Sequence, residues 1–328
     1  MSSETPSTGG LTSEQLAAFW HDGYVIIPNA LPPTTVQALL DETHSLLENF
    51  SISDHPMTRF STGEKSAHVG DDYFLTSGDK VRFFFEEDAF DSNGQLTKSK
   101  ERAINKIGHG LHAKSPPFAA LLDSALNPDL LGAGTSGGSV AAGHKESHPA
   151  AIARALGFKD PRCLQSMVIC KQPEIGGAVP PHQDSTFLYT EPPSAVGFWY
   201  ALEDATAENG CLSFLPGSHR WAPIRQRFVR AKEGGTTFID NDGPKFPAGE
   251  EYGDREGRSE DGEYKMGEVK AGSLVLIHGN LLHKSEKNLS QKGRIIYTFH
   301  VIEGDGTKYD ERNWLQPPAE GFTRLYRE

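Results

Sequence analysis

The chain has 328 residues, of which 23% are charged and 37% hydrophobic, a composition typical of a globular protein with a sizeable core. Acidic side chains outnumber basic ones by 44 to 32, which gives a formal net charge of −12. This charge argues against nucleic acid and anionic membranes as partners, because their phosphates would be repelled. The cysteines Cys163, Cys170 and Cys211 form no CxxC pair, which excludes a disulfide scaffold and a cysteine-type zinc site.

No recognisable address or membrane segment appears in the sequence. No apolar run approaches the roughly 20 residues that span a bilayer. The N-terminal MSSETPSTGG has no apolar signal core, and the C-terminal RLYRE is not a peroxisomal address. We therefore expect a soluble cytoplasmic protein that acts on a small molecule, while the oligomeric state cannot be read from the sequence.

The N-terminal part is predicted to be helical. Residues 1–10 contain almost nothing apolar, so we expect a disordered tail ahead of a single domain over residues 11–328. Thr12 and Gln15 match a capping box, and the apolar residues that follow at helical spacing predict a helix ending at Gly23. The next expected elements are a strand over 24–28 and a helix capped by Thr34 or Thr35.

From about residue 160 onward, short β-rich runs alternate with turn residues. Strands of this length in series are typical of a jelly roll. We therefore predict an α+β fold, in which a double-stranded β-helix (jelly-roll) core is flanked by N-terminal helices. The predicted strands are 164–171, 196–202, 211–215, 272–277 and 294–302, and the predicted loop insertions are 132–148 and 250–263.

The pentapeptide PPHQD at 180–184 is the most informative motif. Residues two apart in an extended chain point to the same face, so His182 and Asp184 can converge while Gln183 points away. One imidazole and one carboxylate supply two-thirds of the facial triad that binds non-haem Fe(II). Taken alone, the tripeptide HxD favours a surface turn after the two prolines over a metal site.

A third ligand has to come from elsewhere in the chain. The downstream candidates are His219, His278, His283 and His300. Arg294 follows His283 by eleven residues, and a turn over 288–293 is expected to pair their strands antiparallel. Arg294 would then lie deeper than the metal, where a buried guanidinium needs an anionic partner such as the carboxylate of a diacid. A structural ion pair is the alternative for Arg294.

Three longer motifs make the sequence resemble the phytanoyl-CoA dioxygenase family of Fe(II)/2-oxoglutarate oxygenases. They are HQDSTFLYTEP (182–192), EDATAENGCLSFLPGSH (203–219) and LVLIHGNLLHKSEKNLS (274–290), and similar stretches extend from about 70 to 317. The resemblance implies iron ligands at His182, Asp184 and His283, which are also the catalytic centre. It further implies 2-oxoglutarate contacts from Lys106, Met167, Trp199, Ser285 and Arg294.

The implied activity is hydroxylation of a small organic or acyl substrate by O2, with 2-oxoglutarate as co-substrate and ascorbate keeping the iron reduced. Two alternatives remain open: a cupin-like metalloenzyme that does not use 2-oxoglutarate, and an inactive 2-oxoglutarate-binding module. His300 shares a strand face with Arg294 and is a candidate for contact with one of the ligands, although a structural histidine is the favoured interpretation. The aromatic residues Tyr73, Phe74, Phe83, Phe84 and Phe85 are either a lid over the substrate or a strand pair packed on the barrel. The basic run 220–232 is more often a solvated face than a site for the phosphates of CoA.

Overall fold

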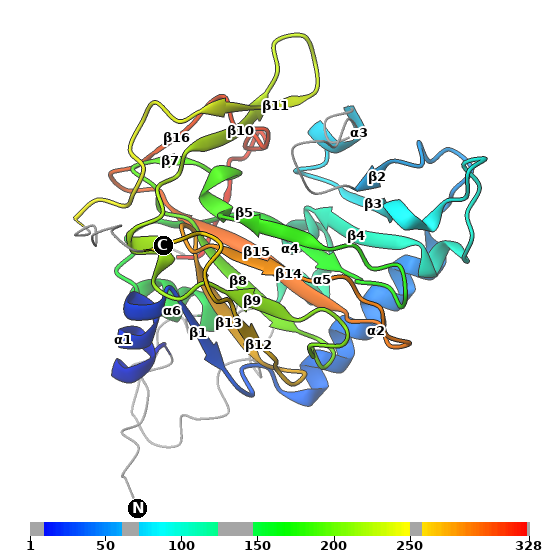
Figure 1. The fold of residues 1–328 in the computed structure, drawn as a ribbon, viewed down its shortest axis with the longest axis horizontal. Helices are drawn as coiled ribbons and strands as arrows, with labels where there is room; N and C mark the ends of the chain where they lie inside the picture. Colours follow the sequence, from blue (N-terminus) through cyan, green and yellow to red (C-terminus); the bar gives the residue numbers. More distant parts are fainter. Residues whose placement is uncertain (1–9, 61–71, 124–146, 250–257, 327–328) are drawn as a thin grey trace, which may run out of the picture.

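The structure, a computed structural model, describes residues 10–60, 72–123, 147–249 and 258–326 (Figure 1). The predicted tail over 1–9, nearly all of the predicted insertion 132–148 and residues 250–257 of the acidic segment lie outside them. Among the helices that are described, none is long and apolar enough to cross a lipid bilayer.

The first helix, α1 (Ser13–Asp22), has both of its predicted ends. Thr12 Oγ1 accepts a hydrogen bond from the backbone of Gln15, whose side chain in turn accepts one from the backbone of Thr12. The helix ends at Gly23, which has a left-handed φ of 83° that favours glycine. The strand β1 (Tyr24–Ile27) follows directly, as expected.

The second helix, α2 (Pro33–Asn49), starts earlier than predicted. Its N-cap residue is Pro32, which makes no side-chain hydrogen bond, so the prediction of a cap at Thr34 or Thr35 was wrong. Proline suits the first turn because its fixed φ matches the helix and an N–H there would have no helical partner. The shorter helices are α3 (Asp72–Leu75), α4 (Leu111–Lys114), α5 (Pro116–Ala119) and α6 (His148–Ala155).

A large sheet forms the main layer of the fold. Its strands follow the order β1-β13-β8-β15-β5-β4-β3-β2, and β17 also pairs with β5. The pairs are antiparallel except for β2 with β3. The other strands are β2 (Arg59–Phe60), β3 (Val81–Glu86), β4 (Ile104–His109), β5 (Pro161–Ile169), β8 (Val196–Ala201), β13 (Leu274–His278), β15 (Ile296–Glu303) and β17 (Thr323–Arg324).

A second, four-stranded sheet faces the large one, with the order β12-β9-β14-β6. Its strands are β6 (Val179–His182), β9 (Leu212–Phe214), β12 (Lys265–Gly267) and β14 (His283–Ser285). Two ribbons complete the described strands: β7 (Thr190–Glu191) with β16 (Lys308–Tyr309), and β10 (Gln226–Arg230) with β11 (Thr236–Asp240). The antiparallel sheets and flanking helices make this a mixed α+β fold, as predicted.

The two faces of the large sheet bury different apolar clusters. On the outer face, Phe198 of β8 packs with residues of the helices, among them Phe19 of α1 and Phe118 of α5. On the inner face, Trp199 of the same strand packs with Phe214 of the small sheet. This alternation follows from the period of two along a strand, and it leaves the space between the sheets for the inward-pointing side chains.

The predicted strands 164–171, 196–202, 211–215, 272–277 and 294–302 correspond to β5, β8, β9, β13 and β15, with ends shifted by up to three residues. The predicted pairing of the segments that carry His283 and Arg294 was wrong. β14 pairs with β6 and β9 in the small sheet, whereas β15 pairs with β5 and β8 in the large sheet. The segment 286–295 therefore crosses between the two sheets instead of closing a hairpin.

Candidate metal centre

The motif at 182–184 lies at the end of β6, beside β14. His182 and His283 are directly paired across these strands, and their ring centroids are 4.2 Å apart. Asp184 Oδ1 lies 3.6 Å from His182 Nε2 and 3.7 Å from His283 Nε2. One ligand atom of each residue lies within 4.8 Å of the other two. Two imidazoles and one carboxylate are the donor set that suits non-haem Fe(II).

A backbone carbonyl orients each imidazole of the cluster. His182 Nδ1 is 3.0 Å from the carbonyl of Pro180, and His283 Nδ1 is 3.0 Å from that of Leu281. Because a carbonyl can only accept, the proton of a neutral ring resides on Nδ1 and the lone pair of Nε2 is left for a metal. Burial, together with the neighbouring His182, lowers the pKa of His283 to about 4, so this ring is neutral at pH 7.

Gln183 fixes the turn between the two ligands that flank it. Its side-chain amide donates to the carbonyls of Ala222, at 2.9 Å, and Asn280, at 2.7 Å. Gln183 therefore points away from the cluster, as the alternation predicts, and His182 and Asp184 share the opposite side.

Burial raises the pKa of Asp184, but the surrounding histidines outweigh burial and hold this pKa well below its usual value.

Of the other candidate histidines, His300 reaches the cluster and the remaining two do not. His300 Nε2 lies 3.3 Å from Asp184 Oδ2, so this ring contacts a ligand, whereas the sequence favoured a purely structural histidine at this position. His219 Nε2 is instead 3.1 Å from the carbonyl of Trp20 in α1. The ring of His278 is tilted against that of His219, with ring centroids 4.8 Å apart, and also packs against Trp20.

Arg294 is buried just ahead of β15, with 2% of its surface exposed. Its guanidinium lies 5.2 Å from the centroid of the Trp199 ring. Within the described part of the chain, its Nε and Nη1 atoms have no hydrogen-bond partner. Burial lowers the pKa of Arg294 to about 10, so the group is still charged at pH 7. The alternative of a structural ion pair therefore has no support, whereas an entering carboxylate would satisfy the open donors.

Lys106 and Met167 also lie between the sheets, on the neighbouring strands β4 and β5. Both side chains are buried, and Lys106 Nζ is 3.8 Å from Met167 Sδ. Burial lowers the pKa of Lys106 to about 7, although the carboxylate of Glu86 acts in the opposite direction. Met167, Thr298 and Trp199 are paired in register across β5, β15 and β8, so these side chains form one row on the inner face.

The predicted aromatic lid is divided between the two faces of the sheet. Phe83 and Phe85 point to the outer cluster, so their assignment to the lid was wrong. Phe74 and Phe84 belong to an inner cluster with Trp314, and the rings of Phe74 and Trp314 stack 4.4 Å apart. Phe187 packs against this inner cluster and lies 6.0 Å from the ring of His182, so the cluster extends to the candidate metal centre.

The model of the phytanoyl-CoA dioxygenase (PhyH) family matches residues 19–296. The chain belongs to this family. Among its relatives is phytanoyl-CoA dioxygenase domain-containing protein 1 of Bos taurus, which is 40% identical over 324 residues that cover 96% of this chain and 99% of the relative. Phytanoyl-CoA dioxygenase of Arabidopsis thaliana is 39% identical over 309 residues, which cover 94% of this chain and 95% of the relative. The family resemblance expected from the motifs is thus confirmed.

Solved structures of 2-oxoglutarate oxygenases share the fold. EctD from S. alaskensis with bound Fe has a TM-score of 0.54 at 19% identity, over 97% of this chain and 84% of that one. The epimerase SnoN from nogalamycin biosynthesis, in complex with Fe3+, alpha ketoglutarate and nogalamycin RO, has a TM-score of 0.54 at 16% identity, over 95% and 98%. At these identities the comparison concerns the fold, and it confirms the double-stranded β-helix.

Two buried residues near Arg294 and Lys106 were assigned no role from the sequence. Lys171 follows β5 on the same face as Met167, and Glu86 ends β3 with 1% of its surface exposed. The alternation from Met167 to Lys171 was a usable signal, because it places a lysine on the inner face of a strand. No comparable signal distinguishes Glu86. It ends a phenylalanine-rich strand, and the sequence does not reveal how deeply that end of the strand is buried.

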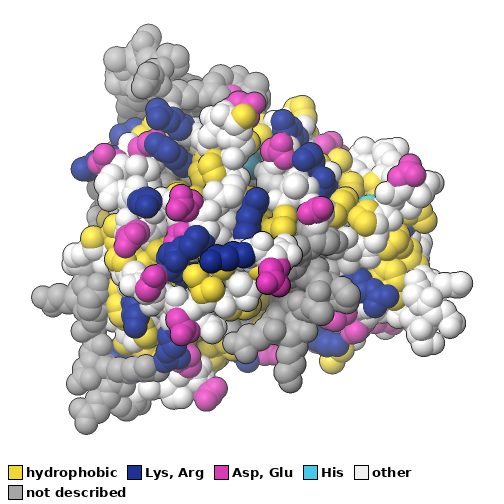
Figure 2. All heavy atoms as spheres, turned by 90° about the horizontal axis from the view of Figure 1, so that it is seen from above, with side chains coloured by type: hydrophobic (Ala, Val, Ile, Leu, Met, Phe, Trp, Pro, Cys, Tyr) yellow, Lys and Arg dark blue, Asp and Glu magenta, His cyan; other side chains and the backbone are white. Residues whose placement is uncertain are grey.

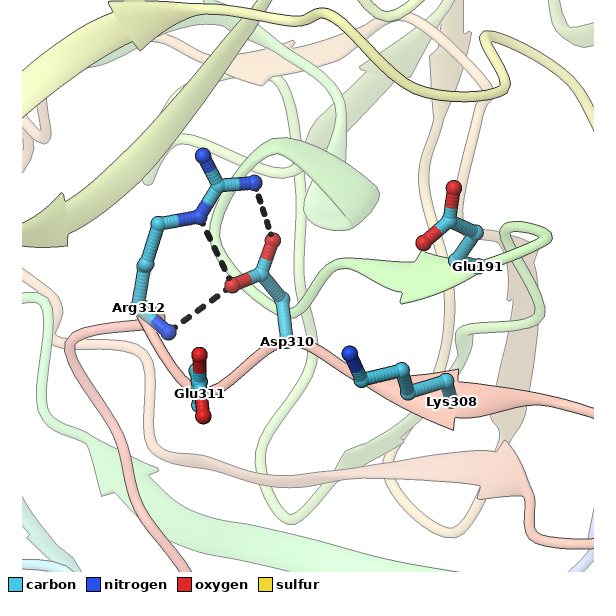
Figure 3. Close-up of a pocket in the computed structure, with 5 residues that line it drawn as sticks. All are labelled: Glu191, Lys308, Asp310, Glu311 and Arg312. Atoms are coloured by element: carbon cyan, nitrogen blue, oxygen red, sulfur yellow. Dashed lines mark hydrogen bonds and ion pairs between the residues drawn. The ribbon is translucent and has the colours of Figure 1, made fainter.

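A surface pocket away from these residues is lined by charged residues: Glu191, Lys308, Asp310, Glu311 and Arg312 (Figure 3). Asp310 is held there by the side chain and the backbone of Arg312. None of the residues predicted for the iron or for 2-oxoglutarate lines this pocket, so we assign it no part in the site.

The basic run 220–232 is not a uniformly solvated face. Arg227, on β10, is 2% exposed and binds both Asp242 and Asp310. Its charge is therefore already neutralised, which removes one basic group from the proposed CoA site. On the face seen in Figure 2, lysine and arginine side chains are interspersed with acidic ones, so the described residues form no continuous basic surface there.

Proposed function

We propose that the protein is an Fe(II)- and 2-oxoglutarate-dependent dioxygenase that hydroxylates a small organic or acyl substrate. In this proposal His182, Asp184 and His283 hold the iron. The observation that carries the proposal is the buried guanidinium of Arg294, whose Nε and Nη1 donors lack partners among the described residues. A cupin-like enzyme without a diacid co-substrate would have no use for such a group.

The residues present fit both the metal and the co-substrate. Iron would supply the redox chemistry, in which O2 oxidises 2-oxoglutarate to succinate and CO2 and one oxygen atom enters the substrate. Arg294 and Ser285 would bind the distal carboxylate, with Trp199 beneath the guanidinium. Lys106 would neutralise a co-substrate carboxylate, and Met167 would pack against its chain. Ascorbate would serve to keep the iron reduced.

The backbone and side-chain groups around the cluster have two roles in this chemistry. The carbonyls of Pro180 and Leu281 keep Nε2 of each histidine pointed at the metal. The inner aromatic cluster around Phe74 and Trp314 excludes water and offers apolar walls to a substrate. These walls support a substrate with a substantial apolar part. The cytoplasmic location stays a prediction from the sequence.

The metal ligands are tested by His182→Ala and Asp184→Ala. We expect each variant to lose the thermal stabilisation by Mn(II). Each should also lose, by more than about 100-fold, the substrate-free conversion of 2-oxoglutarate to succinate in the presence of Fe(II) and ascorbate. His44→Ala, an exposed histidine on α2, is the matched control and should change neither quantity. Undiminished turnover in either ligand variant would overturn the assignment.

The wild-type protein separates the three possible functions in the same assays. A melting shift with Mn(II) and a further shift with 2-oxoglutarate, together with succinate formation, support the dioxygenase. A metal shift without any response to 2-oxoglutarate supports the cupin-like enzyme. A response to 2-oxoglutarate without succinate supports an inactive binding module.

A further inference from the structure

The backbone is shaped around the side chain of Lys171, which is 2% exposed between the sheets. A Cβ atom at Gly176 would lie 2.6 Å from Lys171 Cγ, and one at Gly210 would lie 2.8 Å from Lys171 Cδ and 2.5 Å from the carbonyl oxygen of Glu286. These distances are shorter than real Cβ contacts, and Gly210 also has a φ of 79°. Glycine is therefore required at both positions, and the lysine stem fills a slot made for it.

The ammonium group of Lys171 is held by three acceptors. Its Nζ donates to the carbonyl of Gly177 at 2.8 Å, to the hydroxyl of Ser285 at 3.0 Å and to the carbonyl of Glu286. Because the protonated form of this group can only donate, Ser285 Oγ is then the acceptor in this pair. The hydroxyl hydrogen of Ser285 is then left to point at another acceptor.

Lys171 and Arg294 are two cations held close together in a buried region. The backbone N–H of Arg294 donates to the carbonyl of Lys171 at 3.2 Å. Burial and the charge of Arg294 together lower the pKa of Lys171 to about 7, against the opposing effect of Glu86. Keeping two like charges together here costs free energy, which an anion bound beside them would offset.

We infer that Lys171 is a positioning residue for the distal carboxylate of the co-substrate. It orients the Ser285 hydroxyl as a donor toward that carboxylate and adds a second positive charge beside Arg294. The inference rests on the proposed function. It makes Lys171 a determinant of the preference for a 2-oxo diacid over a 2-oxo monoacid of the same length.

The test compares two ligands that differ in the distal carboxylate alone. Dissociation constants for 2-oxoglutarate and 2-oxopentanoate are measured by calorimetry on the Mn(II)-loaded wild type, Lys171→Met and Lys171→Gln. Lys270→Met is the control, because that lysine side chain is 83% exposed and pairs with Asp204 at the surface. The glutamine variant is uncharged but keeps N–H donors for the carbonyls of Gly177 and Glu286. It therefore serves as the folded neutral variant if Lys171→Met perturbs the loop.

We expect both Lys171 variants to bind 2-oxoglutarate about tenfold or more weakly, while the affinity for 2-oxopentanoate changes by less than about twofold. A merely structural lysine would weaken both ligands in parallel, and that result would overturn the inference. An unchanged affinity for 2-oxoglutarate would overturn it as well. If the wild type binds neither ligand, the proposed function fails together with the inference. If the wild type binds 2-oxoglutarate but the Lys171 variants do not show the expected selective loss, only the inference fails and the proposed function stands.

Discussion

Replacing Arg294 by methionine separates the stability of the protein from its binding of the co-substrate. Burial lowers the pKa of Arg294 from 12.5 to about 10. At about 1.4 kcal/mol per pKa unit, this disfavours the charged group by roughly 3 kcal/mol in the ligand-free protein. Methionine has a similar length and needs no hydrogen-bond partner. We therefore expect Arg294→Met to raise the free energy of unfolding by about 1–3 kcal/mol.

The same substitution should abolish the response to 2-oxoglutarate. In the Mn(II)-loaded wild type, 2-oxoglutarate at about 100 times its dissociation constant should add about 2.7 kcal/mol of stability. Removal of two charge-assisted hydrogen bonds weakens binding by at least about 100-fold, which reduces this increment nearly to zero. Arg294→Met should thus melt a few degrees above the ligand-free wild type and show no further shift with 2-oxoglutarate.

Arg227→Met is the matched control, because Arg227 is also 2% exposed but is paired. Its guanidinium binds Asp242 and Asp310, of which Asp310 is 10% exposed. Its loss leaves a largely buried carboxylate with fewer partners, so we expect destabilisation by about 3 kcal/mol and an undiminished response to 2-oxoglutarate. Thermal melting with and without the ligand measures both variants. Destabilisation of ligand-free Arg294→Met by 2 kcal/mol or more, or a retained ligand shift, would refute the reasoning.

Three further predictions concern pH, the carboxylate ligand and the turn that carries it. Because the pKa values of Lys106 and Lys171 are lowered to about 7, the ligand-free protein should gain stability as pH rises from 7 toward 10, where the unfolded chain binds more protons. Over the same pH window 2-oxoglutarate should bind more weakly, and its binding should take up protons. Calorimetry in two buffers of different ionisation enthalpy measures both quantities, and an affinity that does not change with pH would contradict this prediction. Gly197→Ala places a Cβ atom 3.2 Å from Asp184 Oδ2 and should lower the Mn(II) affinity about tenfold with little change in melting, whereas an unchanged affinity would show that the carboxylate can shift freely. Gln183→Leu leaves two backbone carbonyls without donors and should cost about 2–4 kcal/mol in urea denaturation; a loss under 1 kcal/mol would mean that the turn does not depend on this amide.

The sequence predicted elements more reliably than their pairing. Helix α1 was predictable to its ends because the capping box and Gly23 are local signals. The pairing of β14 was not, because a turn over 288–293 looks the same whether it closes a hairpin or crosses between sheets. What decides the matter is distant in sequence: Asn288 donates its side-chain N–H to the carbonyl of Lys171, and the backbone of Arg294 donates to the same carbonyl.

In the candidate site, too, local features could be predicted from the sequence and long-range ones could not. The alternation of His182 and Asp184 about Gln183 was readable from three residues. Spacing alone did not choose among the four downstream histidines, and the family resemblance made that choice. The depth of the cations was also not readable, because it depends on which strands cover them. Lys106 reads as an ordinary surface lysine until β3 and β5 are seen on either side of β4.

The buried charges of the site indicate why the ligand-free protein is incomplete. Lys106, Lys171 and Arg294 are each at most 6% exposed, and Glu86 is the carboxylate that acts on all three pKa values. Burial raises the pKa of Glu86 itself, so even this compensation is partial. When both lysines are protonated, the three cations exceed the one carboxylate by two charges, which matches the two carboxylates of a 2-oxo diacid. The site thus carries an excess of buried positive charge that the proposed co-substrate would neutralise. Binding should therefore stabilise the protein more than the contact area of the co-substrate alone implies.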